Sequence, residues 1–112
     1  MIRNTDADAV IVQLPLPAGV NQKEICDAIP LEKDADVLST AVREKFEKGD
    51  TNALLPPIVG AVREILKFGN VKVLGKRTVV IGAGFLVGAP VASWLKQQGA
   101  EVTVLTIETE PE

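Results

Sequence analysis

The second half of the chain alternates between short apolar runs and an amphipathic segment. Residues 78–81 predict a buried strand, residues 89–98 a helix, and residues 101–105 a second strand. This order is typical of a parallel βαβ unit, whose connection is expected to be right-handed. Gly99 is expected to end the helix. Because two parallel strands do not make a stable sheet, further strands are expected to complete it.

The first half opens with another strand pattern. Residues 9–14 are almost entirely apolar and β-branched, which predicts a strand covered on both faces, and the run ends at Pro15. Gln13 is its only polar member. Residues 32–38 change from charged to apolar and predict a loop that enters a short strand.

A helix is predicted between these two segments. Asn21 is the expected N-cap, and Glu24 stands three residues later, as in a capping box. The helix is expected to bury Ile25 and Ala28, and Pro30 stops it.

Two more helices are predicted on either side of a boundary near Asn52. The first spans residues 40–48 and ends at Gly49, and the second begins at Pro57. The second helix carries an apolar stripe at helical spacing, formed by Ile58, Ala61, Val62, Ile65 and Leu66.

Composition excludes several classes of function. The net charge is −3, with acidic and basic residues interspersed, which argues against nucleic acid or an anionic membrane as partner. Cys26 is the only cysteine and histidine is absent, so an intrachain disulfide and a Ser-His-Asp triad are excluded. With no apolar run near the roughly 20 residues of a membrane span and no signal peptide pattern, a cytoplasmic location is expected.

A glycine-rich turn follows the predicted strand at residues 78–81. Gly82, Gly84 and Gly88 are spaced G-x-G-x-x-x-G, one residue longer than the common form. Such glycines permit a tight turn, allow the backbone to approach a diphosphate and let the helix pack closely on the strand. The turn therefore predicts a dinucleotide site, although glycines at such turns also serve geometry alone.

An acidic residue after the second strand is expected to bind the ribose hydroxyls of the dinucleotide. Glu108, 20 residues after Gly88, is the candidate. Glu110 and Glu112 lie nearby, and the alternative is that Glu108 is simply a solvated residue.

Three ordered motifs point to one family. Residues 12–17 read V-Q-L-P-L-P, residues 33–36 read K-D-A-D, and residues 82–90 read G-A-G-F-L-V-G-A-P. They resemble the V-Q-L-P-L-P, K-D-V-D and G-R-S-x-x-V-G-x-P motifs of the bifunctional methylene-tetrahydrofolate dehydrogenase/methenyl-tetrahydrofolate cyclohydrolase family. The resemblance covers nearly the whole chain.

The resemblance implies an α/β fold in two parts. Residues 1–52 would be the C-terminal part of the folate-binding catalytic domain. Residues 53–112 would be a long connecting helix and the first βαβ unit of a Rossmann-like domain that binds NAD or NADP. In the family, hydride transfer from methylene-tetrahydrofolate gives the methenyl form, and water then opens the ring to formyl-tetrahydrofolate.

The resemblance also implies roles for individual residues. Gln13 would support the catalytic lysine and the substrate, and Asp36 would bind the amine edge of the pterin. The turn from Gly82 through Ala83 and Gly84 to Gly88 would line the cofactor phosphates. Taken without the motifs, Gln13 reads as a core amide and Asp36 as part of a solvated loop.

The chain departs from the family pattern at several positions. The glycine after the second aspartate is Val37, the Arg-Ser pair of the cofactor turn is Ala83-Gly84, and the later His-Ser pair is Thr106-Ile107. Because the missing arginine is a natural partner for a 2′-phosphate, NAD is expected in preference to NADP.

The family's Tyr-x-x-x-Lys segment is not found among the 112 residues, which contain no tyrosine. We therefore expect a central fragment that is inactive alone, and association as a homodimer or through exposed sheet edges. One alternative is a non-catalytic nucleotide-binding or assembly module derived from this family. Another is an unrelated Rossmann dehydrogenase, which has no reason to carry the motifs of Gln13 and Asp36.

Overall fold

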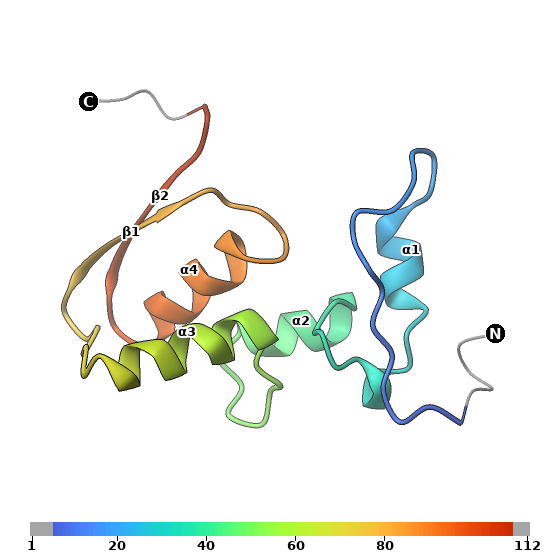
Figure 1. The fold of residues 1–112 in the computed structure, drawn as a ribbon, viewed down its shortest axis with the longest axis horizontal. Helices are drawn as coiled ribbons and strands as arrows, with labels where there is room; N and C mark the ends of the chain where they lie inside the picture. The colour runs from blue at the N-terminus through green and yellow to red at the C-terminus, as the bar shows by residue number, and fades with distance from the viewer. Residues whose placement is uncertain (1–5, 109–112) are drawn as a thin grey trace. The chain divides into compact units, whose positions relative to one another are not determined.

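The chain divides into two compact units in a computed structural model that describes residues 6–108 (Figure 1). The first unit is Met1–Pro57 and the second is Ile58–Glu112. The helical elements of the first unit are α1 (Gln22–Asp27), the 3-10 turn η2 (Leu31–Lys33) and α2 (Thr40–Glu47). The second unit contains α3 (Pro57–Phe68), β1 (Arg77–Ile81), α4 (Gly88–Gln97) and β2 (Glu101–Leu105). The first residue of α3, Pro57, is the last residue of the first unit.

The second unit is a parallel βαβ unit, as the sequence predicts. β1 pairs with β2 in parallel, with Arg77 opposite Glu101 and Ile81 opposite Leu105. α4 packs against both strands and buries Trp94. The predicted ends of the strands and of α4 agree with the structure to within one residue.

The strands of this unit are less covered than predicted. Val79 is 60% exposed and Ile81 is 84% exposed, so the expectation of a fully buried β1 is wrong for this chain. The described residues form a sheet of two strands only, with one helix packed against both of them. The predicted stripe on α3 is only partly covered, since Ile58, Val62 and Leu66 are half-buried and Ala61 and Ile65 are exposed. The one buried residue of this helix, Val59, lies outside the predicted stripe.

The core of the first unit lies between α1 and the two segments that flank it. Asn21 caps α1 as predicted, because its Oδ1 accepts a hydrogen bond from the backbone N–H of Glu24 at 3.3 Å. The predicted buried face is wrong, since Ile25 and Ala28 are exposed. The helix is turned so that its apolar face meets a cluster formed by Leu14, Cys26, Ile29 and Leu38.

The two strands predicted in the first unit do not form. Residues 9–14 make one isolated parallel bridge, Val10 to Asp34, in which the N–H of Val10 donates to the carbonyl of Lys33 at 2.8 Å. The charged start of residues 32–38 lies in the 3-10 turn η2. The carboxylate of Asp34 then bonds to backbone groups ahead of it and so competes with a regular strand ladder.

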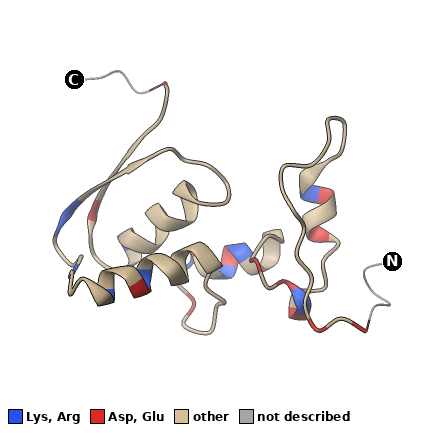
Figure 2. Ribbon diagram, viewed as in Figure 1, with Lys and Arg blue, Asp and Glu red and all other residues tan. Residues whose placement is uncertain are grey.

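Charged residues are spread over both units (Figure 2). The ion pairs found among the described residues join neighbours on one helix and are mostly exposed, so each contributes little to stability. In residues 6–108, no helix has both the length and the apolar character that crossing a membrane requires.

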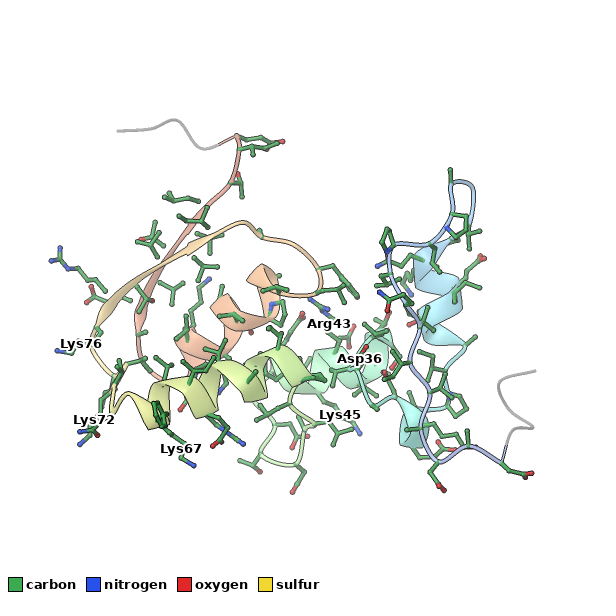
Figure 3. The ribbon with its side chains drawn as sticks, viewed as in Figure 1. Asp36, Arg43, Lys45, Lys67, Lys72 and Lys76 are labelled. Carbon is green, nitrogen blue, oxygen red and sulfur yellow. The ribbon has the colours of Figure 1, made fainter. Side chains whose placement is uncertain are left out.

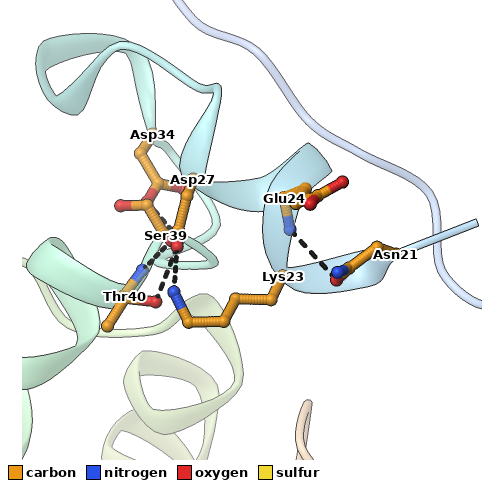
Figure 4. Close-up of polar contacts among 7 residues, drawn as sticks. All are labelled: Asn21, Lys23, Glu24, Asp27, Asp34, Ser39 and Thr40. Atoms are coloured by element: carbon orange, nitrogen blue, oxygen red, sulfur yellow. Dashed lines mark hydrogen bonds and ion pairs between the residues drawn. The ribbon is translucent and has the colours of Figure 1, made fainter.

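The side chain of Asp27 links α1 to α2 (Figure 4). Its Oδ1 accepts from the backbone N–H of Thr40 at 2.7 Å, and its Oδ2 accepts from the hydroxyl of Thr40 at 3.1 Å. Lys23 forms an ion pair with the same carboxylate. The hydrogen bond from Lys23, followed by those from Thr40, lowers the pKa of Asp27 to about 2.

We expect Asp27 to make folding pH-dependent. Because its folded pKa of about 2 lies below the unfolded value of about 3.9, its contribution is complete above the unfolded value. That contribution is lost as the pH falls through the folded value. Asp27→Asn should lower the melting temperature at pH 7 and flatten its fall between roughly pH 5 and pH 2.

Thermal melts across this range measure the effect. Glu64→Gln is the matched control, because Glu64 is an exposed carboxylate whose ion-pair partners, Arg63 and Lys67, lie on its own helix, α3. This control should keep the wild-type dependence on pH. An Asp27→Asn curve parallel to wild type would show that the link between α1 and α2 contributes nothing.

Candidate functional site

The glycine turn begins where β1 ends. The N–H of Gly82 donates to the carbonyl of Leu105 at 2.7 Å, which fixes the start of the turn to the end of β2. Gly82 has a φ of 92°, a conformation that glycine adopts without strain and other residues avoid. The first glycine is therefore required by the backbone.

Gly88 is required by packing. It is buried at the first residue of α4, and a Cβ added there would lie 1.9 Å from the carbonyl oxygen of Gly82. Backbone of the turn and backbone of the helix are therefore in direct contact, which is the third role that the sequence assigns to a glycine in such a turn.

Neither backbone conformation nor packing requires glycine at position 84. Its φ lies outside the left-handed region, and a Cβ added there would meet no atom within 4 Å other than its own chain neighbours. Its carbonyl accepts from the N–H of Ala89 at 3.0 Å, which any residue could do. The absence of a side chain at Gly84 therefore leaves open space above the turn.

The start of α4 suits an anion. Val87, the N-cap, provides no side-chain hydrogen bond to the first turn of the helix, and Pro90 follows shortly after. In α4 the N–H of Ala89 already donates to the carbonyl of Gly84 and Pro90 has no N–H, so the helix dipole is the main feature that favours a negative group there. Together with the space at Gly84, this geometry fits a diphosphate.

Glu108 lies three residues beyond the end of β2 and is exposed. It follows Thr106 and Ile107, and the side chain of Ile107 is fully exposed. Glu108 is therefore at the end of the sheet from which the glycine turn begins. Glu110 and Glu112 lie outside the described residues.

Gln13 and Asp36 lie in the first unit. Gln13 is exposed, and its Nε2 donates to the carbonyl of Leu14 at 3.0 Å, whereas Leu14 itself is buried in the core. Asp36 is half-buried in the segment that leads into α2 (Figure 3). The segments that carry these two residues are joined by the bridge between Val10 and Asp34.

Val37 stands where the family pattern has glycine, and its backbone conformation shows why glycine suits this position. Its φ is 56°, so this position favours the glycine that the family has there. The side chain of Val37 is only 1% exposed. Burial of its two methyl groups offsets part of the backbone strain.

The sequence did not single out Asp34. Its side chain is 1% exposed and accepts hydrogen bonds from the N–H of Leu38 (3.0 and 3.1 Å), the N–H of Ser39 (2.8 Å) and the hydroxyl of Ser39 (2.7 Å). The available signal was an aspartate placed shortly before a Ser-Thr helix start, a common position for side chains that bond to backbone.

A parallel βαβ unit with a glycine turn open at its middle glycine defines a Rossmann-type nucleotide-binding unit. Residues 56–111 match the family profile described as tetrahydrofolate dehydrogenase/cyclohydrolase, NAD(P)-binding domain. The chain belongs to the tetrahydrofolate dehydrogenase/cyclohydrolase family. The resemblance drawn from the three motifs and the predicted α/β class are confirmed, as is NAD or NADP as the cofactor of the matching domain.

Relatives support the assignment along most of the chain. The bifunctional protein FolD of Carboxydothermus hydrogenoformans is 37% identical over 99 residues, which are 88% of this chain and 34% of that protein. The FolD protein of Aromatoleum aromaticum is 40% identical over 100 residues, again 34% of its length. The chain thus spans about a third of the curated relatives that it matches.

Solved structures agree. The FolD methylenetetrahydrofolate dehydrogenase/cyclohydrolase of Campylobacter jejuni matches 98% of this chain and 39% of its own, with 32% identity and a TM-score of 0.90. The Trypanosoma brucei enzyme, solved with NADP cofactor and inhibitor, matches 96% of this chain and 37% of its own, with 34% identity and a TM-score of 0.88. A NAD-dependent dehydrogenase from Saccharomyces cerevisiae, 20% identical with a TM-score of 0.79, shares the fold.

Proposed function

We propose that this chain is part of a methylene-tetrahydrofolate dehydrogenase with methenyl-tetrahydrofolate cyclohydrolase activity, acting in one-carbon metabolism in the cytoplasm. Residues 1–52 contribute to its folate-binding domain. Residues 53–112 contribute the connecting helix and the first half of its cofactor domain. The observation that carries the proposal is the glycine turn between β1 and α4, in which Gly82 turns the backbone and Gly88 lets the helix contact it directly.

The cofactor site consists of the turn and the start of α4. Gly82 and Gly88 set the backbone, Ala83 and Gly84 lie where a diphosphate approaches, and Glu108 binds the ribose hydroxyls. A nicotinamide dinucleotide held by these residues would supply the acceptor for the hydride. Because Ala83 stands where the family has arginine, we propose that NAD is preferred to NADP.

The folate site contains Gln13 and Asp36. A carboxylate suits the amine edge of a pterin because its two oxygens accept two parallel N–H bonds. The exposed amide of Gln13 is available to orient the substrate and the family's lysine. The 112-residue sequence has no tyrosine and so contains no Tyr-x-x-x-Lys segment. We propose that these residues alone do not catalyse the reaction.

The second unit also supports association. The two strands described leave unpaired sheet edges, and Val79 and Ile81 leave one face of the sheet apolar and exposed. Both features favour further strands or another copy. We propose a homodimer or a larger sheet, with neither nucleic acid nor membrane as partner.

A hydride-transfer assay tests the function. The gene product that carries these residues should reduce NAD in the presence of methylene-tetrahydrofolate, as followed by absorbance of the reduced nicotinamide. Gln13→Ala should lower kcat by about a hundredfold, because loss of an orienting contact has effects of this order. Gln98→Ala, which removes an exposed glutamine at the far end of α4, is the control and should keep wild-type activity.

Two other results would change the conclusion. Binding of NAD without any folate-dependent reduction would favour the non-catalytic nucleotide-binding module. Full activity of Gln13→Ala would remove Gln13 from the folate site, even if the dehydrogenase activity itself were present.

A further inference from the structure

Asp34 is the most deeply buried carboxylate among the residues that the structure describes, at 1% exposure. A buried carboxylate is costly unless its oxygens are bonded, and both oxygens of Asp34 are. The donors come from two consecutive residues, Leu38 and Ser39, where the chain enters α2. Figure 4 shows Ser39 beside Asp34. Asp34 therefore closes a loop over residues 35–37.

This loop holds Asp36 in place. Its ends are fixed by the side chain of Asp34, and its backbone is further held by a bond from the N–H of Val37 to the carbonyl of Asp34 at 3.4 Å. Val37 has a φ of 56°, a strained conformation that persists only where surrounding bonds impose it. Asp36, immediately before it, is the half-buried residue that the loop presents.

The same residue also connects to the segment of Gln13. Asp34 is bridged to Val10, and the N–H of Val10 donates to the neighbouring carbonyl of Lys33 at 2.8 Å. Gln13 follows three residues after Val10 along that segment. One buried side chain thus lies at the junction of the two segments that carry the candidate folate-site residues.

We infer that Asp34 is a positioning residue for the folate site, which sets the Asp36 carboxylate against the pterin by fixing the loop between residues 34 and 39. The inference rests on the proposed function of Asp36. A residue that only maintained the fold would change the amount of active protein. A positioning residue changes the affinity for the folate substrate and leaves the affinity for the dinucleotide unchanged.

The test measures KM for methylene-tetrahydrofolate and for NAD in the gene product that carries these residues. Asp36→Asn should raise the folate KM roughly tenfold, the effect of losing one charge-assisted hydrogen bond. Asp34→Asn should raise the same KM by a similar factor and leave the NAD KM at the wild-type value. In the double variant the two effects should not multiply, because Asp34 acts through Asp36.

Asp50→Asn is the matched control. Asp50 also accepts a backbone hydrogen bond, from the N–H of Asn52 at 2.8 Å, but in the exposed connector between α2 and α3. It should leave both KM values unchanged. If Asp34→Asn does not fold, Ser39→Ala replaces it, because that variant removes only the hydroxyl bond and keeps the backbone bonds to Asp34. It should raise the folate KM about twofold to threefold.

The outcomes separate the two hypotheses. If Asp36→Asn leaves the folate KM unchanged, the proposed role of Asp36 is overturned, and the inference with it. The inference alone would be overturned if Asp36→Asn raises the folate KM but Asp34→Asn or Ser39→Ala does not raise it selectively. That is the case if the second variant alters only kcat, or alters both KM values equally. Full multiplication of the effects in the double variant would also overturn it, since Asp34 would then act independently of Asp36.

Discussion

Gly88→Ala is expected to unfold the βαβ unit. The new Cβ would lie 1.9 Å from the backbone carbonyl oxygen of Gly82. Neither that carbonyl nor the backbone of Gly88 can move away without separating α4 from β1. The loss should exceed about 4 kcal/mol, which places it among the most damaging single substitutions. Because whole domains are stable by only about 5–15 kcal/mol, little folded second unit should remain. Circular dichroism and urea unfolding measure this loss.

Gly84→Ala is the matched control, with the opposite pattern expected. Its Cβ enters open space, so the free energy of unfolding should stay within about 0.5 kcal/mol of wild type. The affinity for NAD should also stay close to the wild-type value, because the family motif has serine at this position and its domain therefore accommodates a Cβ there. Loss of NAD binding by a folded Gly84→Ala protein would contradict this expectation and show that this chain needs the open space at Gly84.

The local parts of the fold could be predicted from sequence because they depend on residues near one another. The turn between β1 and α4 follows from Gly82 and Gly88, and the start of α1 follows from Asn21, whose hydrogen bond joins residues only three apart. The order of strand, helix and strand in the second unit follows from apolar periodicity over a few residues at a time.

The errors concern features that depend on distant residues. A strand at residues 9–14 requires neighbouring strands, and the described chain offers only the bridge from Val10 to Asp34. The buried face of α1 is set by Leu14 and Leu38, which its own pattern does not contain. Coverage of Val79 likewise depends on elements beyond the local pattern.

The candidate site divides in the same way. The glycines of the turn are recognisable because spacing alone implies their geometry. Asp34 resembles a solvated loop residue in sequence, and its burial follows only from the path of the chain through Leu38 and Ser39. The left-handed φ of Val37 could not be predicted from a valine, which rarely adopts it.

NAD is expected to bind this protein more tightly than NADP, and Ala83→Arg should reverse or abolish the preference. Ala83 lies in the turn directly after Gly82. Residues 82–88 contain no lysine or arginine that would repel the added arginine. A bidentate bond from arginine to a 2′-phosphate contributes about 1.5–3 kcal/mol, so NADP affinity should rise roughly tenfold to a hundredfold. Calorimetric titration of each dinucleotide into both proteins measures the change.

Glu108 and a control arginine complete the test of this preference. If Glu108 accepts from the ribose hydroxyls and repels a 2′-phosphate, Glu108→Gln should lower NAD affinity and weaken discrimination against NADP, independently of Ala83→Arg. Ala61→Arg adds the same charge at an exposed position on α3, outside the turn, and should leave both affinities unchanged, because salt screens exposed charges that make no direct contact. Tighter binding of NADP than of NAD by the unmodified protein would refute the preference. The preference is expected because Ala83 offers a 2′-phosphate only a methyl group and Glu108 carries a negative charge.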